Sequence, residues 1–151
     1  MIELNIIERE DPCIGWLDML KKYASVPDDS QDALLNALLV KACLRVQEMA
    51  DRSILGCTFE LREDNVEDET VRLYQSVSDI LDVRAADGRE LGWSMRGKAL
   101  RVYESDVVVR YKTEARAGDV ADLLPVVYQY ATALYDGEES VVLANILKQC
   151  R

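Results

Sequence analysis

The chain contains no histidine among its 151 residues, which removes both the commonest general base and the commonest metal ligand. It also lacks the Gly-x-Ser-x-Gly, P-loop and dinucleotide-binding patterns of common hydrolases and nucleotide-binding proteins. The nearest grouping of carboxylates, Asp136 with Glu138 and Glu139, lies where a turn between helices needs polar caps. We therefore expect a protein that is not an enzyme and that uses no cofactor.

The cysteines are few and scattered, and none forms a Cys-x-x-Cys pair. Without histidine they cannot complete a common zinc site, so we predict no bound metal. Cys43 and Cys57 fall on apolar faces of a predicted helix and strand, a position typical of buried thiols in a cytosolic protein. The acidic tract at residues 63–69 lacks the alternating ligands and the glycine of an EF-hand, which favours a solvated loop over a calcium site.

No apolar run is long enough to cross a bilayer, and the first eight residues are too short and too acidic for a signal peptide. The 18 basic and 28 acidic residues give a formal charge of −10, which repels phosphate backbones. We predict a soluble, intracellular protein that binds neither a membrane nor a specific nucleic-acid sequence. The same charge suits a protein that lines a passage through which DNA slides without sticking.

The first third of the chain has the apolar spacing of helices, and its length suits one domain over residues 1–151. Residues 1–10 are expected to form a short strand or an extended arm, and Asp11-Pro12 marks a helix start. Pro27 interrupts the pattern, and a long amphipathic helix is predicted at about residues 30–53.

From about residue 55 to 112 the period of the apolar residues becomes twofold, which predicts five or six short strands in an antiparallel meander. Asp87-Gly88 supplies the positive φ angles of a tight hairpin, and residues 96–98 form a second turn. The Val-rich segment at residues 107–112 is the strongest strand sequence. The predicted fold class is therefore α+β, with helices before and after the strands.

Two helices are expected to close the chain. Pro125 fits a helix only in its first turn, so the first helix is predicted to begin between Asp122 and Leu124 and to end at Tyr135. A last helix at residues 138–151 has an apolar side that needs a partner to cover it. The tyrosines of this region are interpreted as core or subunit-interface residues rather than base-stacking platforms, because no basic groove accompanies them.

Three segments of the chain resemble the head-tail connector (adaptor) proteins of tailed bacteriophages. The acidic cap at residues 28–32 before the long helix is similar to the family's opening, and residues 107–112 resemble its last strand. The apolar, tyrosine-rich segment at residues 123–135, followed by the acidic turn at 136–139, looks like the family's closing helix. The long strand region departs from the mostly helical pattern of many relatives.

This resemblance implies a structural virion protein that forms a homo-oligomeric ring between the portal protein and a tail terminator or stopper, extending the DNA channel after packaging. It implies a place in the virion neck, with assembly in the host bacterial cytoplasm. The implied contacts are the apolar side of the last helix for portal docking and the Asp87-Gly88 hairpin, with the long helix, for contacts between subunits. The predicted partner-binding residues are Val142, Leu143, Ile146, Leu147, Asp87 and Gly88.

Two alternatives stay open from the sequence. A small cytosolic binding or regulatory module would use the sheet to hold a protein partner, and an enzyme subunit would use carboxylates alone. The basic pairs Arg96 with Lys98 and Arg110 with Lys112 fit a solvated face as well as a contact with an acidic partner.

Overall fold

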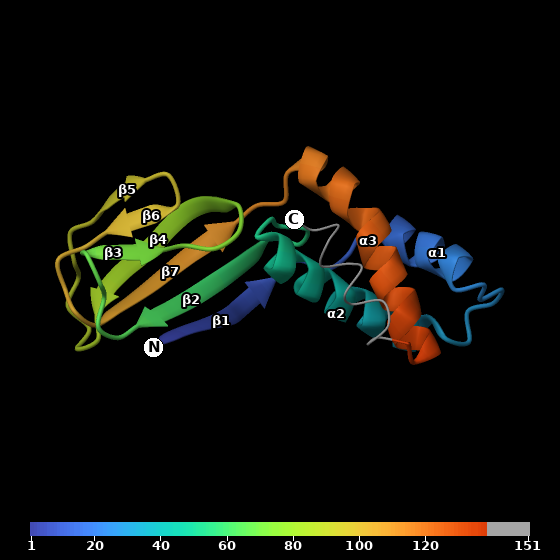
Figure 1. The fold of residues 1–151 in the computed structure, drawn as a ribbon. Helices are drawn as coiled ribbons and strands as arrows, with labels where there is room; N and C mark the ends of the chain where they lie inside the picture. Colours follow the sequence, from blue (N-terminus) through green and yellow to red (C-terminus); the bar gives the residue numbers. More distant parts are fainter. Residues whose placement is uncertain (139–151) are drawn as a thin grey trace. The chain divides into compact units, whose positions relative to one another are not determined.

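The computed structural model describes residues 1–138, and these form three helices and seven strands (Figure 1). The predicted α+β class is confirmed. The chain divides into two compact units. A β unit holds residues 1–9 and 56–114, and a helical unit holds residues 10–55 and the chain from residue 115 onward. That both units act as one domain remains a prediction.

The larger sheet of the β unit has four antiparallel strands in the order β1-β2-β7-β4. Their bounds are β1 (Ile2–Arg9), β2 (Cys57–Glu63), β4 (Val77–Ala85) and β7 (Val107–Thr113). Alternate residues of β2 and β7 are buried, as the twofold apolar pattern predicts. Residues 2–9 therefore form an edge strand of this sheet rather than a separate arm.

The smaller sheet has three short strands in the order β3-β6-β5. Their bounds are β3 (Thr70–Arg72), β5 (Ser94–Arg96) and β6 (Ala99–Arg101). With these, six strands lie in the region predicted to hold five or six. Their order is not that of a simple meander, because the chain pairs only briefly with β4 after the hairpin, through Arg84 and Glu90. The next two strands, β5 and β6, belong to the small sheet, and the following strand, β7, lies between β2 and β4 in the large sheet.

The core of the β unit centres on Tyr111, which has no exposed surface. Its ring stacks on Phe59 with the ring centroids 5.5 Å apart. Its hydroxyl accepts a hydrogen bond from the backbone N–H of Tyr74 at 3.2 Å. The buried hydroxyl thus satisfies a backbone donor in the segment that leads from β3 to β4.

The helical unit packs three helices around its own apolar core. Their bounds are α1 (Ile14–Tyr23), α2 (Asp32–Ala50) and α3 (Ala117–Asp136). The long helix α2 is shorter than the predicted 30–53, because Asp51 adopts a left-handed conformation with φ of 53°. The buried side-chain oxygen of Gln47 accepts the N–H groups of Ile54 and Leu55, each at 3.1 Å, and so orders the chain beyond the helix.

Two predicted helix starts are wrong. The first helix begins at Ile14 instead of directly after Asp11, because Cys13 still has extended backbone angles and serves as its N-cap. Helix α3 begins at Ala117, so Pro125 lies inside it rather than in its first turn. Pro125 and Ala121 are both exposed, and water can therefore bind the Ala121 carbonyl that has no N–H donor at residue 125.

The predicted burial of particular side chains is confirmed. Cys43 and Cys57 are buried, and so are Tyr111, Tyr128 and Tyr130, as expected for core positions. Of the predicted last helix at residues 138–151, the part from residue 139 onward lies outside the described residues.

Candidate functional site

The described surface carries several groups of exposed side chains that are suited to binding. Within residues 1–138, no group of three or more Cys, Asp or Glu side chains is placed to hold a metal ion. In the same part of the chain, no helix is both long enough and apolar enough to span a membrane. The features that stand out are exposed apolar and charged side chains, and each is described in turn.

The predicted hairpin at Asp87-Gly88 is present at the end of β4. Gly88 has a φ of +95°, and its N–H donates to the Ala85 carbonyl at 2.9 Å. Asp87 accepts hydrogen bonds from the backbone N–H of Arg89 at 3.1 Å and from its Nε at 2.8 Å. The Arg89 guanidinium also reaches Glu104 at 3.0 Å, so the tip is held together by bonds within the chain.

These bonds shift the acidity of the hairpin groups. The backbone N–H and the guanidinium of Arg89 lower the pKa of Asp87, and Asp87 in turn raises the pKa of Arg89. Both side chains are therefore charged at neutral pH. Because they already pair with each other, the tip offers a rigid shape to a partner more than an unpaired charge.

The other predicted partner-binding residues, Val142, Leu143, Ile146 and Leu147, lie outside the described residues. The role predicted for them in docking stays a prediction.

The outer face of the small sheet gathers basic side chains that are separate in the sequence. Val71 and Leu100 point into the core, and the alternating positions carry Arg72, Arg96 and Arg101 on the opposite face. The guanidinium of Arg72 lies 5.4 Å from the ring centroid of Tyr74, in cation–π contact. Sequence analysis noted Arg96 with Lys98, but the pairing of three short strands was needed to bring the other arginines beside them.

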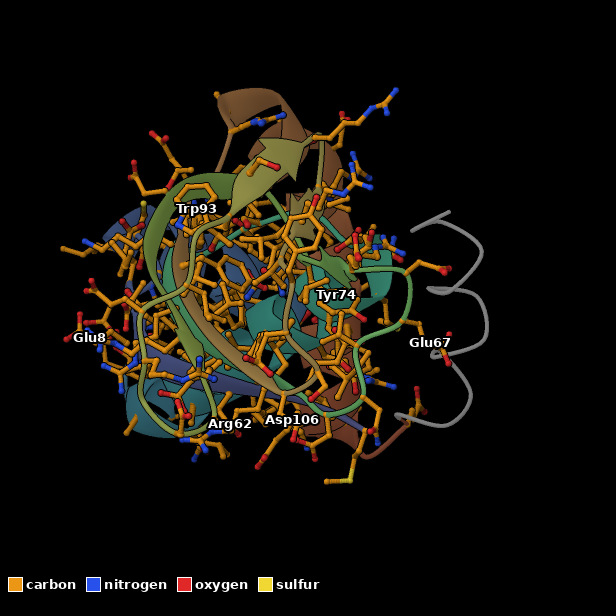
Figure 2. The ribbon with its side chains drawn as sticks, turned by 90° about the vertical axis from the view of Figure 1, so that its left-hand side faces the viewer. Glu8, Arg62, Glu67, Tyr74, Trp93 and Asp106 are labelled. Atoms are coloured by element: carbon orange, nitrogen blue, oxygen red, sulfur yellow. The ribbon has the colours of Figure 1, made fainter. Side chains whose placement is uncertain are left out.

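A hollow of about 390 Å³ lies at the β5 side of this sheet, next to the basic face. Trp93 is 45% exposed and Tyr103 is 71% exposed at its walls, and Arg101 also lines it. Figure 2 shows Trp93 on one side of this end of the unit and Glu67 on the other. Tryptophan, tyrosine and arginine are the side chains that most often dominate protein–protein binding energies. Sequence analysis did not single out these residues.

The edge strand β1 leaves apolar side chains in water. Ile2, Ile6 and Ile7 are each about half exposed, although Ile6 lies opposite the buried Phe59 in the register of the sheet. A bulge between Ile6 and Glu8 interrupts the pairing and keeps the edge from being uniformly flat.

The outer face of the large sheet is a ladder of ion pairs. Arg62 and Arg110 bind opposite oxygens of Glu60 at 2.9 and 3.0 Å. The hydrogen bond from Arg62, with a smaller contribution from Arg110, lowers the pKa of Glu60. At the end of the same strand, Glu63 has a raised pKa because it is partly desolvated, and the nearby Glu67 raises it further. The charges of Glu60, Arg62 and Arg110 are thus paired on this face, whereas Asp64 and Glu67 in the loop that follows make no ion pair within residues 1–138.

Comparisons with known proteins give a likeness of fold only. No protein-family model matches the sequence, and no curated protein matches it either. The solved structures that are similar are chains of gene transfer agent particles. One lies in the neck of an empty particle computed with C6 symmetry: it is 15% identical, with a TM-score of 0.61 over 89% of this chain and 84% of that one.

A chain in the virion of the native gene transfer agent particle has a TM-score of 0.64 at 16% identity, over 88% of this chain and 84% of that one. A third, in the neck of the native particle computed with C12 symmetry, has a TM-score of 0.58 at 16% identity, over 89% and 83% of the two chains. This chain therefore shares its fold with chains of a phage-like head-tail connector region, and the predicted resemblance is confirmed at the level of the fold.

Proposed function

We propose that this protein is a structural component of the neck of a phage-like particle. Copies of the chain form a ring between the portal and the tail terminator or stopper, extend the DNA channel after packaging, and catalyse no reaction. The observation that supports this most strongly is the fold shared with neck chains over 88–89% of the sequence, a span that draws on both compact units.

We propose a ring of twelve copies. The neck structures that contain similar chains were computed with C6 and with C12 symmetry. A twelvefold ring also has sixfold symmetry, so twelve copies fit both descriptions, whereas six copies fit only the first. Assembly in the host bacterial cytoplasm and a final place in the virion neck follow from this role.

The net charge of −10 supports a channel position, because a negative wall repels the phosphates of DNA and reduces sticking. The contacts between subunits are assigned to the rigid Asp87-Gly88 hairpin and to the exposed side of α2, where Leu34 is 48% exposed.

Co-sedimentation with portal rings encoded in the same genome tests this function, followed by negative-stain imaging of the complex. A ring of added density at one end of the portal is the expected result. A folded protein that leaves the portal unchanged would contradict the proposal and favour a free-standing binding module.

Docking on the portal is assigned to Val142, Leu143, Ile146 and Leu147, which the sequence places on one side of a helical pattern. The variant V142D/I146D is expected to abolish co-sedimentation, because each aspartate would have to be desolvated in an apolar contact. The variant A144D/N145D adds the same charge to the same segment on the other side of the helical pattern and should still bind. Equal binding by both variants would refute the assignment of these four residues.

A further inference from the structure

Two patches of opposite charge lie beside the small sheet, a basic one toward β5 and an acidic one toward β3, and a long ion pair joins them. Arg96 is on the edge strand β5 and makes no ion pair with any residue in the described part of the chain. Arg101, on the central strand, reaches only Glu69 among those residues, at 3.9 Å. At the β3 edge, the loop of residues 63–69 carries Asp64 and Glu67, which have no ion-pair partner among residues 1–138.

This arrangement contrasts with the rest of the β unit. On the large sheet, Arg110 binds Glu60 at 3.0 Å and Arg84 binds Asp82 at 2.6 Å. These charged side chains are paired at short distances within the chain. Between the basic and acidic patches of the small sheet, the described residues form one long ion pair, Arg101 with Glu69 at 3.9 Å, and Figure 2 shows Trp93 and Glu67 on opposite sides of this end of the unit.

The carboxylates of the acidic loop at residues 63–69 repel one another. Five of its seven residues, from Glu63 to Glu69, are acidic. Burial raises the pKa of Glu63, the N-terminal ammonium lowers it in part, and Glu67 raises it further. A cationic surface placed against this loop would therefore relieve a cost that the single chain carries.

The basic patch also has an apolar anchor beside it. Trp93 and Tyr103 line the hollow of about 390 Å³ together with Arg101. Exposed tryptophan and tyrosine rings next to arginine are typical of the central, energetically dominant residues of protein interfaces.

We infer that the basic, aromatic edge of the small sheet, with Trp93, Arg96 and Arg101, docks on the acidic 63–69 loop of a second copy of this chain. The two patches lie on different edges of one unit, so every copy keeps one of each available and the contact is head-to-tail. Such a contact repeats from copy to copy and closes into a ring where the rotation permits. The inference rests on the proposed ring and deepens it by adding a contact surface to the hairpin and the side of α2 assigned above.

Single-stranded DNA is the other ligand that arginines and exposed aromatic rings can bind. The net charge of −10 opposes it, because the phosphates would approach a chain that repels them at long range. A second copy supplies the opposite charge without that penalty.

Sedimentation velocity on the full chain tests the contact, from about 5 to 500 µM protein in low salt. The wild type is expected to associate, and about 0.5 M salt should weaken association at least tenfold because screening shortens to a few ångströms. Reversing either patch, in R96E/R101E or in D64K/E67K, should weaken association at least tenfold. Combining all four substitutions restores complementary charge and should return it to within about threefold of the wild type.

Two controls test whether a loss of association comes from the change in net charge or from misfolding of the variant. K22E/R116E, at exposed positions of the helical unit that belong to no proposed contact, changes the net charge as much as R96E/R101E does and should associate like the wild type. W93A should weaken association about thirtyfold, which corresponds to about 2 kcal/mol. Circular dichroism confirms that each variant is folded.

Three results would overturn the inference. They are a wild type that is monomeric throughout the range, a loss of association in K22E/R116E equal to that in R96E/R101E, or a quadruple variant whose association is not restored. Binding of a fluorescent single-stranded oligonucleotide that R96E/R101E abolishes, without self-association, would reassign the patch to DNA. Portal co-sedimentation reports separately on the proposed function, so a failed contact and a failed function are distinguishable.

Discussion

The side chain of Gln47 provides the sharpest test of how the helical unit is held together. It is 1% exposed, and its Oε1 accepts the backbone N–H groups of Ile54 and Leu55, both at 3.1 Å. Those two residues are themselves buried, so no water replaces the acceptor. The substitution Q47M keeps the length of the side chain and removes the acceptor.

The loss of stability in Q47M can be estimated from the two backbone N–H groups that lose their acceptor. Each buried N–H left without a partner costs about 1–3 kcal/mol, and burial of the apolar methionine side chain offsets part of the cost of the two N–H groups. We expect Q47M to lower the free energy of unfolding by about 2–4 kcal/mol. This corresponds to a fall of about 1–2 M in the urea midpoint.

Urea unfolding followed at 222 nm measures the change, since the helical unit dominates that signal. Q129M makes the same exchange at an exposed position of α3 and should stay within about 0.5 kcal/mol of the wild type. A loss below about 1 kcal/mol in Q47M would refute the view that this glutamine closes the end of α2.

Three further predictions concern stability. P125A restores an N–H donor for the Ala121 carbonyl inside α3 and should raise the free energy of unfolding by about 1–3 kcal/mol. P27A, in an exposed loop, should not raise it, and chemical unfolding of both variants measures the difference. Glu63 has a pKa raised above 4.5, so its ionisation costs folding energy at pH 7, and E63Q should stabilise the protein there but not near pH 4. Glu60 has a pKa lowered below 4.5, so E60Q should destabilise at pH 7, and the difference should vanish as the pH falls through the folded-state pKa. Equal effects of E63Q and E60Q at pH 7 in unfolding curves would contradict the opposite signs.

The elements that sequence predicted well are those with a strong local signal. The twofold alternation of β2 and β7 and the Asp87-Gly88 turn depend on neighbouring residues, and the structure has them where they were expected. Helix α3 was predicted to begin too late, because a local rule excludes Pro125 from a helix interior. Whether an exposed carbonyl can bind water instead depends on which side of the helix faces solvent, and that is a tertiary property.

The sequence by itself determined the fold class, the burial of Tyr111 and Tyr130, the acidity and the likeness to connector proteins. Only the tertiary structure decided the strand order, with β7 between β2 and β4, and the division into two units. It also decided the basic, aromatic edge, because Arg96 and Arg101 share a face with Arg72 only once three strands pair in a particular register. Local patterns specify elements, but surfaces are made of residues far apart in the chain, and their proximity depends on long-range packing.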